Sequence, residues 1–564
     1  MYKNNKKGIY TIMSISLLMF VYSKGLSQSW DIVKTFGSPG FDEGINIDID
    51  NDKNIYFAGI YTEAFDIDSV LLNLDNSGSC LFRNDIILVK IDSLGNTNWI
   101  KQINGKCVDN IFSIIEKDEW LYLSGNINSF SNDTGHINFC DSSIYIDQTS
   151  AFIAKLNANN GELDWLKLYP TSSNSVYVTS DVNNDNELYC VISFSDNINI
   201  EGTAYSTNTS NPDVIHSILL KYNEFGSLIW NVHIKNNNED SGLLRIEAGK
   251  ELFIYGIYND TVFFGNDTID VLINSAGTYI SKVDTSGNHL WTKSIQCLNM
   301  ESYHMTTDNN SNIYITGMYS DTLRFLGNVF LPIYNDDVFI AKIDSTGSLI
   351  WWKQIVGNLG FYYESWVRNL AVNDIEEVFF YNEISLVYDT VIIDSVWLVP
   401  NGVFNHDFVC KLSKDGVCQW GFTMPVIDHF SINAINAKGN DLFITGDFSG
   451  VNNQLGSQSL YSNGSSDMYI ANFNYLLNQY ELINKGNISC ILYPNPAKNN
   501  INVKVINHKK WEIKLEIVDM HGRVVQEIEF GNNINVDISD LQPGLYFVKI
   551  ITGNNTILKK FIKQ

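Results

Sequence analysis

Short apolar runs separated by turns rich in Asn, Asp, Ser and Gly follow one another along the chain. Ile45, Ile47 and Ile49 alternate with polar residues, which predicts a strand with one buried face. The run 86–89 is continuously apolar, as is typical of a strand that neighbours cover on both faces. In the first repeat these patterns predict four antiparallel strands, at 44–49, 55–61, 86–91 and 98–103.

Three strand signals recur together. The first is a strand of the type Asn-Ile-Tyr-x-x-Gly, seen at 54–59 and 312–317 and in looser versions between and beyond them. The second is an apolar strand that ends in lysine, such as 85–90, and the third is a strand that opens with tryptophan after a Gly-containing turn. The tryptophans of the third signal are Trp30, Trp99, Trp165, Trp230, Trp291, Trp351 and Trp420.

The tryptophans recur on average every 65 residues, which is the size of a four-stranded propeller blade. The first tryptophan strand, 30–36, has no lysine strand before it, and the seventh lysine strand, 468–473, has no tryptophan strand after it. Pairing these two strands would close a ring without a bare edge. We therefore predict an all-β chain with a seven-bladed β-propeller of four-stranded blades at 28–474, in which each tryptophan wedges between blades. Alternatively, residues 475–483 supply the missing strand.

The N-terminus has the pattern of a secretory signal. Lys3, Lys6 and Lys7 precede an apolar stretch at 9–22, and small residues follow it. We predict a signal peptide at 1–27, cleaved between Ser27 and Gln28. A membrane anchor is the alternative, but the apolar run is shorter than the ~20 residues that a span needs. No later segment is apolar for long enough, so we expect no integral membrane segment after cleavage.

The repeat resembles the propeller-type repeats of exported bacterial proteins, the SBBP-like repeats, in which Lys-x-Asp-x-x-Gly-x-x-x-Trp hairpins recur, as at 342–351. The turn and tryptophan also resemble the docking motif of pyrroloquinoline-quinone dehydrogenase propellers, most closely at 157–165. Those enzymes carry two adjacent cysteines, and this chain has none. The resemblance therefore implies a fold and no quinone cofactor.

Residues 490–564 differ in character from the repeats. Their landmarks are Tyr493, Pro494, Asn495, Pro496, Asp519, Gly522, Arg523, Pro543, Gly544, Tyr546, Lys559 and Lys560. This pattern closely resembles the type A C-terminal sorting domain of the type IX secretion system. The resemblance implies a small Ig-like β-sandwich at 490–564 after a linker at 475–489, a secreted or cell-surface location, and the secretion machinery with its sortase as partners. An Ig-like binding module is the alternative.

The strong negative charge argues against nucleic acid and anionic lipid as partners, and one acidic turn is a candidate Ca²⁺ site. The net charge of −26 disfavours nucleic acid and anionic lipid. Asp50, Asp52 and Asn54 offer the alternating oxygen ligands that Ca²⁺ prefers. The same residue types fit a hairpin turn for backbone reasons, which is the simpler interpretation. We expect no other cofactor.

Catalytic motifs are missing from the sequence. It contains no Gly-x-Ser-x-Gly, His-Glu-x-x-His or phosphate-binding glycine loop. Acidic pairs such as 336–337 and 376–377 are more typical of turns than of a glycosidase site. Among the eight cysteines, Cys410 and Cys418 are the nearest candidates for a disulfide.

Two function classes remain: a non-catalytic protein that binds a glycan, peptide or protein, and a hydrolase or lyase without recognisable motifs. The insertions 66–84 and 130–149 are candidates for shaping a rim site.

Overall fold

The computed structural model describes residues 30–74, 80, 83–128, 135–172, 176–207, 214–236, 244–258, 262–264, 267–269, 277–297, 300–333, 337–355, 370–384, 391–394, 396–398, 406–424, 428–451, 453–455, 458–474, 489–493, 497–506, 513–519, 524–531, 533–542, 544–552 and 555–563. These residues form strands and turns and contain no helix, so the all-β prediction is confirmed. Contacts divide them into two compact units, a large unit at Trp30–Phe473 and a C-terminal unit that begins at residue 474. Within the described ranges we find no helix with the length and hydropathy needed to cross a membrane.

Seven antiparallel sheets, each built on four main strands, form the body of the large unit in the described residues. The first contains β2 (Asp42–Ile49), β3 (Ile55–Tyr61), β6 (Asp85–Ile91) and β7 (Thr97–Asn104). The second contains β8 (Asn110–Lys117), β9 (Trp120–Ile127), β12 (Ser150–Asn157) and β13 (Leu163–Pro170). The third contains β14 (Val176–Val182), β15 (Leu188–Phe194), β18 (His216–Tyr222) and β19 (Leu228–Asn236). The fourth contains β20 (Leu244–Ala248), β21 (Leu252–Tyr258), β24 (Gly277–Val283) and β25 (His289–Gln296).

The last three sheets repeat this order. The fifth contains β26 (Met300–Thr307), β27 (Ile313–Tyr319), β30 (Asp337–Ile343) and β31 (Leu349–Ile355). The sixth contains β32 (Leu370–Val372), β33 (Val378–Ile384), β36 (His406–Leu412) and β37 (Cys418–Thr423). The seventh contains β38 (Phe430–Lys438), β39 (Asp441–Phe448), β42 (Asp467–Asn474) and the N-terminal strand β1 (Trp30–Phe36).

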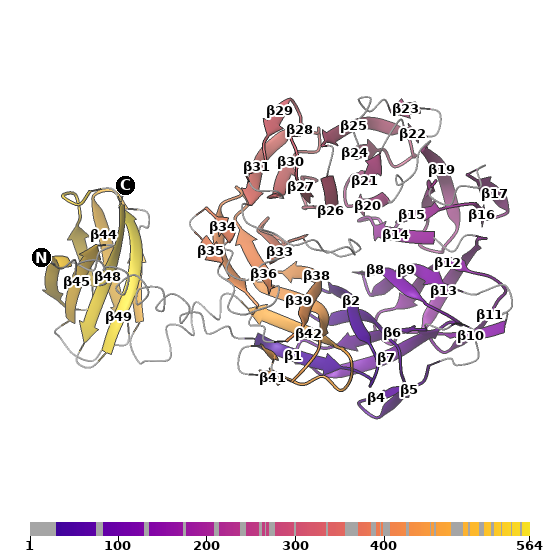
Figure 1. The fold of residues 1–564 in the computed structure, drawn as a ribbon, viewed down its shortest axis with the longest axis horizontal. Coiled ribbons are helices and arrows are strands. Elements are labelled where there is room, and N and C mark those ends of the chain that lie inside the picture. The colour runs from indigo at the N-terminus through magenta and orange to yellow at the C-terminus, as the bar shows by residue number, and fades with distance from the viewer. Residues whose placement is uncertain are drawn as a thin grey trace, which may run out of the picture. The chain divides into compact units, whose positions relative to one another are not determined.

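The first strands of neighbouring sheets lie beside one another. Contacts run from β2 through β8, β14, β20, β26 and β32 to β38, and from β38 back to β2. The sheets of the large unit accordingly surround a common centre (Figure 1). Every residue of β3 and β6 is buried, as expected for strands covered by a sheet on each side.

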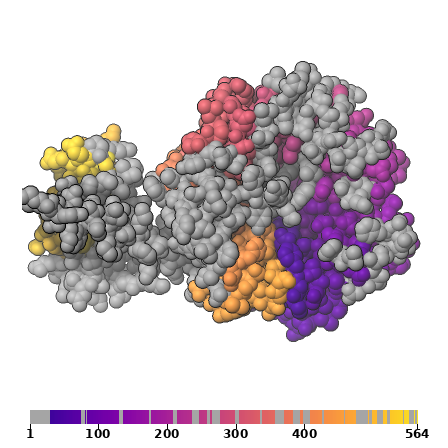
Figure 2. Space-filling model, viewed as in Figure 1, coloured from indigo at the N-terminus to yellow at the C-terminus, as the bar shows by residue number. Residues whose placement is uncertain are grey.

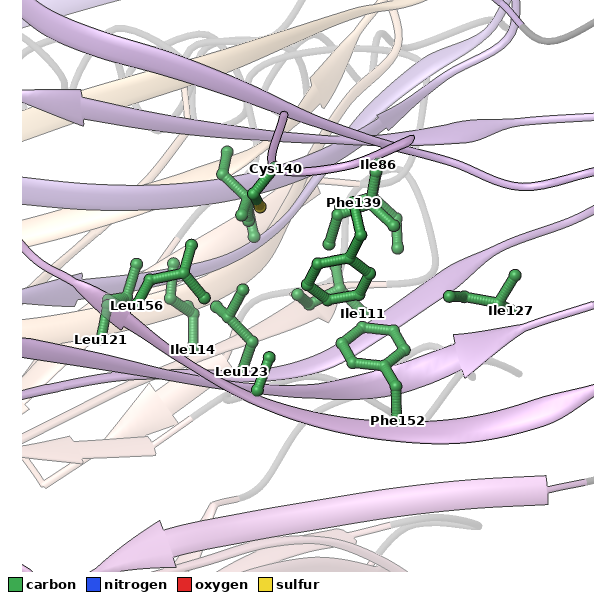
Figure 3. Close-up of a cluster of buried hydrophobic side chains, with 14 of the residues drawn as sticks. Ile86, Ile111, Ile114, Leu121, Leu123, Ile127, Phe139, Cys140, Phe152 and Leu156 are labelled. Atoms are coloured by element: carbon green, nitrogen blue, oxygen red, sulfur yellow. The ribbon is translucent and has the colours of Figure 1, made fainter. Parts of the chain in front are cut away.

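Apolar side chains between the sheets form the core. One cluster joins the first two sheets and includes Ile86 from the first and Ile111 and Leu123 from the second (Figure 3). Phe139 and Phe152 meet edge to face in it, with ring centroids 5.2 Å apart. Burying one such ring contributes about 1.5–3 kcal/mol. The core is therefore built between the repeats, which stabilise one another.

The N-terminal strand completes the last sheet. β1 runs antiparallel to β42, with Val33 opposite Ala471 and Phe36 opposite Met468. The indigo and orange surfaces of the first and last sheets consequently touch (Figure 2). This is the pairing that the sequence predicts for 30–36 and 468–473. The alternative strand at 475–483 lies outside the described residues.

The register of β1 corrects one prediction. In the other sheets the repeat tryptophan pairs with the repeat lysine, as Trp99 does with Lys90. In the last sheet Ile32 pairs with Asn472, the residue in the lysine position, and Trp30 lies one bulge earlier, opposite Phe473. Trp30 is thus not the seventh copy of the repeat tryptophan. It is buried against Phe473 instead, with ring centroids 5.3 Å apart.

A short hairpin lies between the second and third strands of every sheet. We call these seven the rim hairpins because Figure 1 places them at the outer edges of the sheets, away from the common centre. They are β4 (Phe65–Ile67) with β5 (Val70–Leu72), β10 (Gly135–Phe139) with β11 (Ser142–Ile146), β16 (Asn197–Ile200) with β17 (Thr203–Ser206), β22 (Val262–Phe264) with β23 (Asp267–Ile269), β28 (Leu323–Phe325) with β29 (Asn328–Phe330), β34 (Val391–Ile393) with β35 (Val396–Leu398), and β40 (Asn453–Leu455) with β41 (Gln458–Leu460).

The rim hairpins also link neighbouring repeats. β10 of the second repeat pairs with β7 of the first, and β22 and β28 pair in the same way with β19 and β25. Each thus covers part of the outer edge of the preceding sheet, where bare backbone groups would otherwise invite other strands. The sequence indicated insertions at 66–84 and 130–149 but not a hairpin in every repeat.

The C-terminal unit has two sheets. One contains β43 (Ser489–Tyr493), β44 (Asn500–Ile506) and β47 (Asn533–Asp537). The other contains β46 (Val524–Phe530), β45 (Ile513–Asp519), β48 (Gly544–Thr552) and β49 (Asn555–Lys563). Side chains from both sheets, including Ile501, Val536 and Ile517, share one buried cluster.

Candidate functional site

The repeat tryptophan and lysine meet at the turn of the following sheet. Trp165 Nε1 donates to the Glu224 carbonyl oxygen at 3.3 Å, and Lys155 Nζ donates to the same oxygen at 2.9 Å. Trp99 and Lys90 share the carbonyl oxygen of Ala158 in the same way, both at 3.1 Å. The Lys-turn-Trp pattern is therefore a joint between sheets.

The other repeat tryptophans also lie in structural positions. Trp230 and Lys221 donate to the Thr285 carbonyl oxygen, at 3.0 Å and 3.2 Å. Trp351 Nε1 donates to the Lys414 carbonyl oxygen at 2.9 Å. Rings pack around the remaining two, Trp291 against Phe253 and Trp420 against Phe422 and Phe473. These contacts give the tryptophans a packing role.

The candidate Ca²⁺ residues form a hydrogen-bonded turn. Asp50 Oδ1 accepts the backbone N–H of Asp52 at 2.9 Å and of Asn54 at 2.8 Å. Asp50 Oδ2 accepts the side-chain amide of Asn54 at 2.7 Å. Asp308 makes the same contacts with Asn310 and Asn312, so the arrangement belongs to the repeat. Ca²⁺ binding here stays a prediction. Measuring the melting temperature with and without the ion tests it.

Tight turns of this kind lie at one end of the sheets. A side-chain oxygen accepts the backbone N–H groups two and four residues later, which fixes the turn. The accepting residues are Asp50, Asp92, Asn183, Asn223, Asp284, Asp308, Asp344 and Asn373. The rim hairpins and the connections between sheets lie at the opposite end, because neighbouring strands are antiparallel.

The rim hairpins expose apolar side chains. Val70 and Leu71 on β5 are 45% and 55% exposed, and Tyr145 on β11 is 58% exposed. Leu331 and Ile333, which follow β29, are 63% and 65% exposed. The tight turns at the other end also expose apolar side chains, such as Leu94 at 84% and Phe225 at 76%. Exposed apolar side chains therefore occur at both ends of the sheets, and they are grouped on hairpins only at the rim.

Ion pairs fasten several rim hairpins to the preceding sheet. Lys101 of β7 pairs with Asp141 in the turn of the next rim hairpin. Lys167 Nζ lies 3.0 Å from Glu201 Oε1, and Lys353 Nζ lies 2.7 Å from Asp394 Oδ1, in equivalent positions. Each pair contributes about 0–1 kcal/mol because its charges are partly exposed. Their role is to orient the hairpins.

A polar network joins the last sheet to the first at the rim-hairpin end. Asp447 accepts a hydrogen bond from Ser431 Oγ and lies 3.0 Å from His429 Nε2. Asn433 Nδ2 donates to Glu43 Oε1 at 2.8 Å. Ser431 contacts the carboxylate rather than the imidazole, and it is 2% exposed. This arrangement is not a catalytic triad, in which a histidine activates the serine.

Other residues considered from the sequence have structural partners. Glu376 pairs with Lys342 at 2.8 Å and Glu377 with Lys411 at 2.6 Å, whereas Asp336 lies outside the described residues. The buried Asp337 accepts the backbone N–H of Ile333 at 2.6 Å. Within the described residues, no group of three or more His, Cys, Asp and Glu side chains is placed to hold a metal ion.

The cysteines differ partly from expectation. Cys80 and Cys107 form a disulfide, a pairing that the sequence did not indicate. Cys410 and Cys418, the pair that the sequence indicated, are free thiols whose sulfur atoms lie 3.0 Å apart across the β36–β37 hairpin.

Only part of the sorting pattern lies in described residues. Tyr493 ends β43, Asp519 ends β45, and Gly544 begins β48. Tyr546 on β48 stacks on Phe561, and Lys559 and Lys560 lie on β49. Pro494, Asn495, Pro496, Gly522, Arg523 and Pro543 lie outside the described residues, as do Ser27 and Gln28 of the predicted signal peptide and most of the predicted linker.

Comparison with known proteins identifies the C-terminal unit. Residues 491–564 match the family model of the secretion system C-terminal sorting domain. This domain indicates export by type IX secretion to the cell surface or the extracellular space. The predicted location and the interaction with that secretion system are thereby supported.

The remaining similarities are partial. An uncharacterized WD repeat-containing protein of Acanthamoeba polyphaga mimivirus is 25% identical over an alignment that covers 34% of this chain and 16% of the relative. The chain thus spans a small part of the curated relative that it matches. Among solved structures, the phage phi92 endosialidase aligns with a TM-score of 0.36 and 8% identity, covering 79% of this chain and 69% of that one. Dimeric latent PorU from Porphyromonas gingivalis aligns with a TM-score of 0.12 and 9% identity, covering 74% and 31%.

Proposed function

We propose that this exported protein is a non-catalytic binding protein, in which a seven-bladed β-propeller presents one end to a ligand outside the cell. The cyclic contacts of the seven sheets and the pairing of β1 with β42 support the propeller. The partial similarity to a WD repeat-containing protein agrees with it. In this proposal the large unit is built of SBBP-like repeats and the C-terminal unit is an Ig-like sandwich that a sortase recognises.

The observation that carries the proposal is the difference between the two ends of the sheets. Short turns closed by their own Asp or Asn side chains form one end. Rim hairpins, whose lengths and sequences differ from repeat to repeat, form the other. They and the residues beside them expose Leu71, Tyr145 and Leu331. A site that varies in sequence on a constant scaffold suits recognition, since loops supply binding residues while strands hold them in place.

The chemistry of the rim favours a protein or peptide ligand. Val70, Leu71 and Ile333 are exposed aliphatic side chains. Burying them against a partner's apolar surface removes them from water, which lowers the free energy of the complex. A glycan is the second ligand class. The strongly negative chain disfavours nucleic acid.

Binding by the purified mature protein tests this function. The full chain is applied to a glycan array and to a library of extracellular peptides, and affinities are measured for the wild type and for Leu71→Asp and Leu331→Asp. We expect both variants to weaken binding at least tenfold. Leu94→Asp is the matched control, because Leu94 is 84% exposed in a turn at the opposite end. Equal affinity of all four proteins, or no ligand in either library, would contradict the proposal.

One observation favours an enzyme as the alternative function. Burial, with the charges of Asp48 and Asp50, raises the pKa of Glu116 to about 7. A carboxyl group that titrates near neutral pH is suited to general acid–base chemistry. Turnover in a panel of hydrolase and lyase substrates that Glu116→Gln abolishes would establish this alternative and exclude the non-catalytic one.

A further inference from the structure

Two histidines of the third sheet lie side by side at the end that carries the rim hairpins. His216 begins β18 and His233 lies on the neighbouring strand β19. Ile218 is the residue directly opposite His233, so His216 is its diagonal neighbour on the same face. His216 Nδ1 and His233 Nε2 are 3.2 Å apart, and the ring centroids are 5.1 Å apart.

Aromatic rings flank His233. Phe194 stacks on His233 at a centroid distance of 6.4 Å, and the Tyr205 ring meets it edge on at 5.2 Å. A neutral imidazole offers one ring nitrogen with a lone pair to a metal ion.

The spacing of the two nitrogens matches a pair of metal ligands. With metal–nitrogen distances of about 2.0–2.1 Å, two neighbouring imidazole ligands of one ion place their nitrogens roughly 3.0–3.4 Å apart. The observed 3.2 Å lies in that range. His216 is buried, while His233 is half-buried, so an ion could reach the pair from the side of His233.

We propose that His216 and His233 form a two-ligand site for a divalent transition metal of the class that imidazole prefers, Cu²⁺, Zn²⁺ or Ni²⁺. Water completes the coordination. Binding replaces the His–His hydrogen bond, and the imidazole proton moves to the nitrogen that faces away from the ion. The site is distinct from the Asp50 turn, whose oxygen atoms would suit Ca²⁺. Export exposes the pair to metal ions outside the cell.

Copper titration of the full mature chain, first treated with a chelator, tests the proposal. Bound Cu²⁺ is counted by isothermal titration calorimetry, and its ligands are identified from the nitrogen couplings of its electron paramagnetic resonance spectrum. We expect one ion per chain at this site, with two imidazole nitrogens. Zn²⁺ should compete for it.

Variants separate this site from other histidines. His216→Gln and His233→Gln should each weaken Cu²⁺ binding at least tenfold and leave at most one nitrogen coupling at this site. His136→Gln is the matched control, because His136 is an exposed histidine of the rim hairpin β10–β11 and should leave the site unchanged. If a variant fails to fold, the spectrum of the wild type decides. No bound copper, a signal without two imidazole nitrogens, or equal binding by folded variants would show that the pair is a hydrogen-bonded contact only.

Discussion

Gly226 lies so close to the indole of Trp165 in the preceding sheet that a Cβ atom at position 226 would be 2.9 Å from Trp165 Cδ2. Gly226 also has a φ of +73°, which side chains disfavour. The same approach joins Gly161 to Trp99 and Gly416 to Trp351. The glycine of the repeat is thus required both by its own turn and by the tryptophan of its neighbour.

Replacing Gly226 with alanine should cost more than backbone strain alone. Positive φ costs about 1–2 kcal/mol for a residue with a side chain, and forcing a methyl group into a packed contact costs roughly 1–3 kcal/mol more. Gly202→Ala is the matched control, because Gly202 has a φ of +87° and no neighbour within 4 Å of a Cβ. Urea unfolding should show a larger loss of stability for Gly226→Ala. Equal losses of unfolding free energy in the two variants would mean that the close contact with Trp165 does not contribute to the effect.

Asp467 should make the stability of the large unit depend on pH. Burial, to which the charge of Asp42 adds, raises the pKa of Asp467 to about 6. A carboxyl group with a raised folded-state pKa stabilises the fold fully below its unfolded pKa of about 3.9, and this contribution is lost as pH rises through 6. The loss approaches about 3 kcal/mol by pH 8.

The Asp467→Asn variant removes this titration. Its stability relative to the wild type should therefore rise between pH 4.5 and pH 7.5, as measured by chemical unfolding at each pH. Asp66→Asn, at an exposed position of β4, serves as the control for a change of surface charge. A constant difference between Asp467→Asn and the wild type across this range would contradict the assignment.

Sequence periodicity was sufficient for the long strands and for their order. Strands with a continuous apolar run, such as 86–89 in β6, follow from it, because burial on both faces leaves such a run. The pairing of β1 with β42 follows from the unpaired strands at the two ends of the repeats. The rim hairpins could not be found in this way. Strands of three residues, such as β4 and β5, are too short to show an alternation.

Two further features depend on contacts that periodicity does not encode. Trp30 is a tryptophan near the start of the expected strand, so it looks like a copy of the repeat tryptophan. A bulge nevertheless places Ile32, and not Trp30, opposite Asn472. Cys80 and Cys107 are 27 residues apart, and no spacing rule identifies them as partners. The His216–His233 pair likewise depends on the register between two strands.

The disulfide should be a measurable part of the stability of the first repeat. Closing a loop of 27 residues stabilises a protein by about 3.5 kcal/mol in the chain-entropy model. We expect Cys107→Ser to lower the free energy of unfolding by about 2–4 kcal/mol. Under non-reducing conditions, peptide mapping of the mature wild type should recover residues 80 and 107 in one cross-linked fragment. Alkylation of both thiols without prior reduction would exclude the bond.

Export should require the C-terminal unit. Deleting 490–564 removes the matched sorting domain, so the truncated chain should remain in the periplasm. Cell fractionation with an antibody against the large unit measures this, and a full-length chain produced at the same level is the reference. Surface display or secretion of the truncated chain would refute the role of the domain.

The measurement that most directly tests the account is the unfolding of a chain that lacks 30–36, the residues of β1. If β1 closes the large unit by pairing with β42, its deletion exposes an edge of the last sheet and removes the buried Phe36. Unfolding is monitored by tryptophan fluorescence at increasing urea concentration. The predicted result is a lower urea midpoint for the whole large unit. An unchanged midpoint would contradict closure by β1, and with it the proposed seven-bladed propeller.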